Sequence, residues 1–140
     1  MSEFTNVAVQ TVTAGQNVLF NETPVRGNGC VRHRDGSGIV SLSGNTAQCR
    51  AQYKVTFGGN IAVSTGGTAG AISVALSLDG EPLASATAIS VPAAVGNFSN
   101  VFVAVFVDVP RGCCATIAVE NTSTQAIDVQ NANLIVERIA

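Results

Sequence analysis

The sequence predicts an all-β fold, a two-sheet antiparallel sandwich of about ten short strands. Nearly every apolar segment alternates with period two and is rich in Val, Ile and Thr, as strands with one buried face are. Gly, Asn or Asp residues, which favour tight turns, stand at the ends of these segments. No long segment carries the apolar stripe of an amphipathic helix, so we expect strands throughout.

Chain length indicates the domain organisation. The 140 residues suffice for an independent core, and no linker or repeat divides them. We therefore expect a single domain over residues 1–140, in which 1–20 form a candidate N-terminal docking segment. Charged residues make up 11% of the chain and hydrophobic residues 46%, so small polar side chains must supply much of the exterior.

Charge and hydropathy argue against two classes of partner. The net charge is −2 and the basic residues are scattered, whereas nucleic-acid binding needs a clustered basic surface. No run approaches the roughly 20 apolar residues of a membrane span. The first residues, MSEFTNVAVQ, lack the cationic and apolar regions of a secretory signal. We expect a chain made in the cytosol, with no nucleic acid and no membrane as partner.

The expected strands follow from alternation and turn signals. In chain order they cover residues 7–13, 17–21, 29–33, 38–43, 50–63, 71–78, 84–91, 101–109, 115–121 and 127–139.

Glycines and prolines justify the boundaries of these strands. Asp79-Gly80 separates two alternating segments and predicts a tight turn, because Gly tolerates positive φ. Gly58-Gly59 interrupts the long strand 50–63 and predicts a bulge or bend. Pro92 and Pro110 end strands, where a missing amide donor is tolerated. The terminal strand 127–139 is expected in the middle of a sheet.

The segment 101–109, VFVAVFVDV, is apolar on both faces. Its valines form one face, and Phe102, Ala104 and Phe106 form the other. Burying a Phe side chain is worth about 1.5–3 kcal/mol, so two phenylalanines left in water would make a poor exterior. We expect sister copies of the chain to cover this face. A loop of the same chain folding over it is the alternative.

Several of these segments together resemble a known family. The stretches YKVTF (53–57), ISVALSLDG (72–80), FVAVFVDV (102–109) and LIVERI (134–139) resemble the ten-stranded jelly roll of the tumour necrosis factor and complement-head superfamily. The variety is similar to the C-terminal heads of bacterial collagen-like (exosporium-type) spore-surface proteins and to small bacteriophage structural proteins. Departures are the absence of a Gly-X-Y collagen tract and the presence of the Cys113-Cys114 pair.

The resemblance implies a compact homotrimer with aromatic and small apolar residues along its three-fold axis. It places Phe102, Ala104 and Phe106 at the trimer interface, together with Tyr53 of the long strand. Asp108 shares the face of Phe106, so a ring of three acids around an axial ion is one alternative and a solvated strand end is the other.

Signs of catalysis and metal binding are weak. His33 is the single histidine, and no nucleophile, zinc or phosphate-loop motif accompanies it, so we expect a surface or inter-subunit polar role for it. We expect no catalytic residues, no cofactor and no metal site. Adjacent Cys113 and Cys114 point to opposite faces of a strand and cannot easily share one ion.

The other cysteines and the aromatic content bear on redox state and sugar binding. We favour free buried thiols, and a Cys30–Cys49 disulfide is the alternative. The chain has no Trp and one Tyr, so a sugar-binding site has no support from its aromatic residues.

The expected function is that of a non-enzymatic, trimeric structural protein of a bacteriophage particle, either a capsid decoration protein or a fibre head. Its partners would be its own copies and the major capsid protein or another virion component, and its location the virion surface. The alternatives are a jelly-roll head on a bacterial cell or spore surface and a receptor- or glycan-binding trimer.

Overall fold

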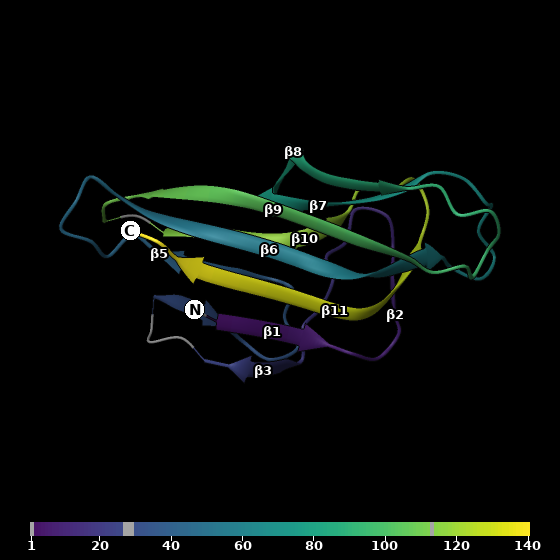
Figure 1. Cartoon of the computed structure of the whole chain (residues 1–140), viewed down its shortest axis with the longest axis horizontal. Helices are drawn as coiled ribbons and strands as arrows, with labels where there is room; N and C mark the ends of the chain where they lie inside the picture. Colours follow the sequence, from purple (N-terminus) through teal and green to yellow (C-terminus); the bar gives the residue numbers. More distant parts are fainter. Residues whose placement is uncertain (1, 27–29, 113) are drawn as a thin grey trace.

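Two antiparallel sheets lie face to face and form a β-sandwich (Figure 1). The computed structural model describes residues 2–26, 30–112 and 114–140. Within these ranges every regular element is a strand, which confirms the all-β prediction. None of the described residues belongs to a helix long and apolar enough to cross a membrane.

Sheet 1 contains the long strands of the fold. Its order is β3 (Glu22–Val25), β1 (Ser2–Asn6), β11 (Ile127–Arg138), β6 (Arg50–Val63) and β9 (Ser99–Pro110), and β2 (Gln10–Val12) also pairs with β11. Strand β11 is therefore central in its sheet, as the sequence predicts. Strand β9 is an edge strand, paired with β6 along its whole length.

Sheet 2 has the order β4 (Val31–His33), β5 (Val40–Ser43), β10 (Cys114–Asn121), β7 (Ile72–Leu78) and β8 (Glu81–Ser90). The two sheets enclose one core of aliphatic and aromatic side chains. Tyr53, Phe57 and Leu134 from sheet 1 and Leu42 and Ile117 from sheet 2 have no exposed surface in it.

The N-terminal part of the chain differs from the prediction. Strand β1 was not expected, because its inward positions are Ser2, Phe4 and Asn6, and the two polar residues hide the alternation. The expected strand 17–21 is replaced by isolated bridges at Asn17 and Phe20. Strands β1 and β2 are built into sheet 1, so the docking role of residues 1–20 stays a prediction.

The predicted bulge at Gly58-Gly59 exists, but the extra residue belongs to the partner strand. Asn131 and Ala132 of β11 lie opposite the single Gly59 of β6, and Asn131 has a φ of +55°. A Cβ on Gly59 would lie 3.4 Å from the Ala132 Cα. The glycine thus leaves room for the bulged strand to approach.

The predicted tight turn at Asp79-Gly80 is confirmed. The two residues connect Leu78 to its cross-strand partner Glu81, and their φ values are +52° and +87°. A two-residue hairpin turn with positive φ at both positions matches the right-handed twist of the strands.

This turn gives a test of the backbone argument. Gly80→Ala is expected to lower the free energy of unfolding by about 1–2 kcal/mol, because alanine is strained at positive φ although no atom lies near the added methyl group. Gly70→Ala is the control, since Gly70 has no positive φ and the nearest atom to its added Cβ is 4.0 Å away. Urea denaturation of both variants measures the difference, and equal stabilities would contradict the argument.

Candidate functional site

The outward side of β9 is the candidate site, and we call Phe102, Ala104 and Phe106 the β9 face. Phe102 is 68% exposed and Phe106 is 70% exposed, with the exposed Ala104 between them. The valines at alternate positions face the core, and all but the half-buried Val105 are buried. The two-faced pattern is confirmed, and the alternative of a cover from the same chain is wrong.

The cross-strand neighbours on β6 are small beside Phe102 and charged beside Phe106, which lies opposite Lys54. Phe102 lies opposite Gly58, and Ala104 lies opposite Thr56. Gly58 has no side chain, and a Cβ there would lie 4.0 Å from the ring of Phe102. Small groups beside a large ring leave an uneven apolar surface, into which a second apolar surface can pack.

The polar end of this strand carries an ion pair. Asp108 lies on the same side of β9 as Phe106, as expected, and its Oδ2 accepts a hydrogen bond of 3.1 Å from Nη1 of Arg50. Both side chains are more than half exposed, so the pair contributes little to stability. The carboxylate is already partnered within the chain. No group of three metal-binding side chains occurs among residues 2–26, 30–112 and 114–140.

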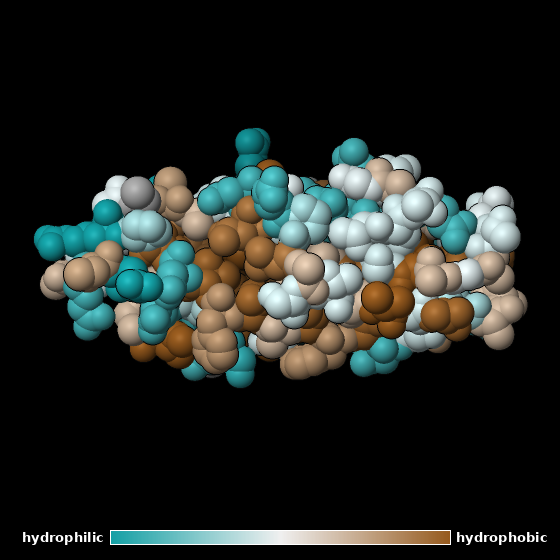
Figure 2. Space-filling view, turned by 90° about the horizontal axis from the view of Figure 1, so that it is seen from above, coloured by the Kyte–Doolittle hydropathy of each residue, from teal (hydrophilic) through white to brown (hydrophobic). Residues whose placement is uncertain are grey.

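The β9 face also lies at an edge of the sandwich, next to β8 of the other sheet. Figure 2 looks onto this side of the molecule and shows hydrophobic residues gathered in its middle and in separate patches toward the right. Ile89, at the end of β8, is 69% exposed. It lies opposite Ser73 on the outer side of sheet 2, away from the β9 face.

Tyr53, the fourth residue expected at the interface, lies in the core instead. Its ring has no exposed surface, because position 53 of β6 pairs with Val107 and shares its inward direction. The hydroxyl donates a hydrogen bond of 2.6 Å to the carbonyl oxygen of Ser43. Burial raises the pKa of the Tyr53 hydroxyl, and the Arg138 guanidinium, 5.9 Å from the ring centre, opposes this in part. Tyr53 therefore links the two sheets, and its buried ring has no surface that another copy of the chain could contact.

The three described cysteines are free thiols, but they are not all buried. Cys49 and Cys114 are exposed, and Cys30 is half-buried with its Sγ 3.0 Å from Nη1 of Arg138. The preference for free thiols over a Cys30–Cys49 disulfide agrees with this structure. Cys113 lies outside the described residues.

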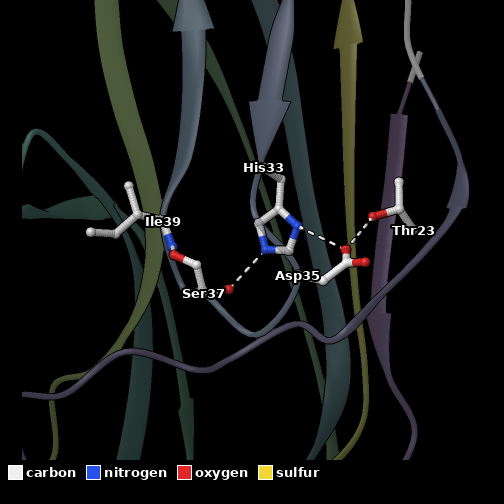
Figure 3. A network of polar contacts seen from close by, with 5 residues as sticks. All are labelled: Thr23, His33, Asp35, Ser37 and Ile39. Carbon is white, nitrogen blue, oxygen red and sulfur yellow. Dashed lines mark hydrogen bonds and ion pairs between the residues drawn. The ribbon is translucent and has the colours of Figure 1, made fainter.

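His33 has a different place from the one expected. Its side chain has no exposed surface, and its ring packs against Phe4, with 4.6 Å between ring centres. Nε2 is 2.8 Å from the carbonyl oxygen of Ser37, and Nδ1 is 3.9 Å from Oδ1 of Asp35 (Figure 3). The expected surface role is therefore wrong. The Phe4 ring that covers the histidine belongs to β1, a strand that the sequence did not predict.

Comparison with solved structures shows the fold. The chain is similar to the tumour necrosis factor Eiger from S. frugiperda, with a TM-score of 0.70 and 14% identity over 99% of this chain and 91% of that one. It is similar to the globular domain of zebrafish complement 1qA, with a TM-score of 0.59 and 12% identity over 96% and 94% of the two chains. Murine APRIL has a TM-score of 0.59 and 11% identity over 97% and 98%.

These likenesses confirm a jelly roll of the tumour necrosis factor type. No protein-family model matches the sequence, and no curated protein matches it. These three structures do not confirm the exosporium and bacteriophage variety of the fold, because they are tumour necrosis factor and complement-head proteins.

The structural role of Tyr53 predicts a pH dependence. Because burial raises the pKa of its hydroxyl, its stabilisation is complete below the ordinary tyrosine pKa of 10.0 and is lost as the pH rises through the higher folded-state pKa. Tyr53→Phe is expected to lower the free energy of unfolding by about 1 kcal/mol at pH 7, the net contribution of a hydrogen bond. The variant should also lose less stability than the wild type as the pH rises above 10, because it has no hydroxyl to ionise. Urea denaturation between pH 7 and 11 measures both, and an equally steep alkaline loss in the variant would contradict the assignment.

Proposed function

We propose that the chain is a non-enzymatic head that assembles into a homotrimer through the β9 face and serves as a structural or binding component of a larger surface. One observation carries this proposal: Phe102 and Phe106 lie on one face of β9, with Ala104 between them, and are 68% and 70% exposed. A continuous strip of exposed apolar residues along one strand face is typical of an interaction surface.

Burying these two rings against another chain is favourable in free energy. Full burial of a Phe side chain is worth about 1.5–3 kcal/mol, so the two rings of each chain offer a substantial gain on assembly. The gain is largest at Phe102, which lies opposite Gly58, whereas covering Phe106 also brings the partner close to the exposed Lys54 across the strand pair. The contact between chains is thus the arrangement that best uses the surface.

The family resemblance supports three copies rather than two. A trimer about an axis lined by aromatic and small apolar residues is what the resemblance implies, and the fold of that family is the one observed. Phe102, Ala104 and Phe106 have the residue types for that axis. Asp108, at the polar end of the same face, is paired with Arg50 and brings no unpaired charge to it.

The finer assignment is to a bacteriophage particle, as a capsid decoration protein or fibre head on the virion. Its support is compositional: only 11% of the residues are charged, and a weakly charged chain rich in small polar residues suits an external surface. A bacterial cell or spore-surface head is the alternative with the same support. A receptor- or glycan-binding trimer is a further alternative.

Gene order distinguishes the first two assignments. A virion component is expected beside capsid and portal genes, and a spore-coat head beside sporulation genes. Peptides of this chain in purified virions would support the first assignment. Their absence from virions together with a sporulation neighbourhood would overturn it in favour of the coat.

The trimer has a direct test in Phe106→Asp. We expect the wild type to have a solution mass of about three times the 14.2 kDa of one chain, and the variant to dissociate because like charges would be buried together. Light scattering measures both masses, and circular dichroism checks that the separated chains keep their strands.

Ile89→Asp is the matched control for this experiment. Ile89 has nearly the exposure of Phe106 but lies on the outer side of sheet 2, so its charge should leave the mass unchanged. A monomeric wild type, or a Phe106→Asp variant that keeps the wild-type mass, would remove the basis of the proposal.

A further inference from the structure

A polar trough runs along the outer side of sheet 2, over β4 and β5, and we call it the β4–β5 trough. Two adjoining hollows form it, one of about 260 Å³ and one of about 400 Å³. Arg32 and Ser41 line both hollows, so the two form one continuous depression. Ser43 lines the first hollow and Arg34 lines the second. The trough therefore presents guanidinium and hydroxyl groups to solvent.

Strand alternation sends these side chains outward. Val31 packs against the core and His33 is buried, so Arg32 and Arg34, at the alternate positions, point to the outer side and are exposed. The valine and the leucine of β5 are buried, so its two serines point outward as well. Residues two apart in an extended chain are about 6.6 Å apart. The two arginines therefore extend from neighbouring points along one wall of the trough.

The trough carries positive charge that the chain does not neutralise there. Neither Arg32 nor Arg34 belongs to an ion pair within the described residues. No aspartate or glutamate among those residues lines the trough. Asp35, the next residue along the chain, accepts a hydrogen bond from Thr23 and lines the hollow between β1, β3 and β4 instead (Figure 3). A chain with a net charge of −2 thus has a locally positive surface at this place.

The floor of the trough supplies further hydrogen-bond donors. Ser41 lies opposite Arg32 across the β4–β5 pair, and both serines are half-buried. Oγ of Ser43 accepts a hydrogen bond of 3.1 Å from the backbone N–H of Asn45, which leaves its own proton free to donate. Serine side chains are short, so the longer arginine side chains stand beside them as a wall. An anionic group that lies on the serines can therefore also reach a guanidinium.

These groups suit a ligand with several anionic groups in succession. A guanidinium binds a carboxylate or a phosphate through two parallel hydrogen bonds, and such charge-assisted bonds are roughly twice as strong as neutral ones. Two arginines in a row match two successive anionic groups. Both hollows are open to solvent, and neither encloses a ligand. A linear polyanion therefore gains more from this trough than one small ion does.

The lining distinguishes between classes of linear polyanion. Binding of single-stranded nucleic acid commonly uses aromatic side chains on which the bases stack, and no Phe, Tyr or Trp of the described residues lines the trough. Recognition of an extended peptide uses pockets for its alternate side chains, whereas this floor is formed largely by serines. Serine hydroxyls both donate and accept, as the hydroxyls of a sugar do. The chemistry of the trough favours a polysaccharide.

From these observations we propose that the β4–β5 trough binds a linear anionic polysaccharide. Successive carboxylate or sulfate groups lie on Arg32 and Arg34, and sugar hydroxyls lie on Ser41 and Ser43. The proposal does not rest on assembly through the β9 face, because the trough lies on sheet 2 and β9 belongs to sheet 1. A chain that is monomeric and still binds the polysaccharide would support it, and a trimer that binds none would overturn it alone.

Titration calorimetry of the full chain tests the ligand class with alginate, which carries carboxylates, and dextran sulfate, which carries sulfates. At least one is expected to bind, and more weakly as the salt concentration rises, because salt screens exposed charges. Uncharged dextran is expected not to bind. Absence of binding by both anionic polysaccharides would overturn the proposal. Binding of polyglutamate or of oligothymidylate as tight as that of the better polysaccharide would overturn it in favour of an acidic peptide or a nucleic acid.

Variants test the site itself. Arg32→Gln and Arg34→Gln change exposed side chains without an ion-pair partner, and each is expected to weaken binding of the better polysaccharide about tenfold. Arg50→Gln removes the same charge from sheet 1 and should leave the affinity unchanged. Wild-type affinity in both trough variants would overturn the site, as would an equal loss in Arg50→Gln. Circular dichroism checks that each variant keeps its strands.

Discussion

Strand β9 buries its valines, and this forces its phenylalanines into solvent. Side chains of a strand alternate between two faces, so the residues that fill the core determine which residues remain outside. A shift of one residue would bury Phe102 and Phe106 but would expose the valines, and the full-length pairing with β6 fixes the register against such a shift. The apolar outer side of β9 is therefore a consequence of how the core is filled, and no change of register within one chain can bury it.

Strong alternation allowed much of the fold to be predicted. The boundaries of β6 agree with the prediction at both ends, and the Asp79-Gly80 hairpin has the expected length. Strands β1 and β3 were missed for physical reasons. Strand β1 turns Ser2 and Asn6 inward, and β3 is a mostly exposed edge strand that contains Pro24, so neither shows the apolar pattern on which the prediction depends.

The candidate sites differ in how far a sequence can show them. The β9 face is a local pattern within one strand, and it was predicted residue by residue. Tyr53 was misplaced because the family resemblance, and not the alternation, put it at the interface. The apolar Tyr53 and Val55 alternate with the polar Lys54, a pattern that already favours the core for the tyrosine. The burial of His33 could not be predicted, since its ring is covered by Phe4 of β1, a strand that was itself missed.

The position of β9 decides how the β9 face can be covered. In sheet 1, β3 and β1 lie at one edge, β9 lies at the other, and β11 and β6 separate them. Because β9 pairs with β6 along its whole length, its apolar outer side is held as one continuous strip at the edge of the sheet. The proposed assembly of three copies would use this strip, and it would need no rearrangement of the strand within one chain.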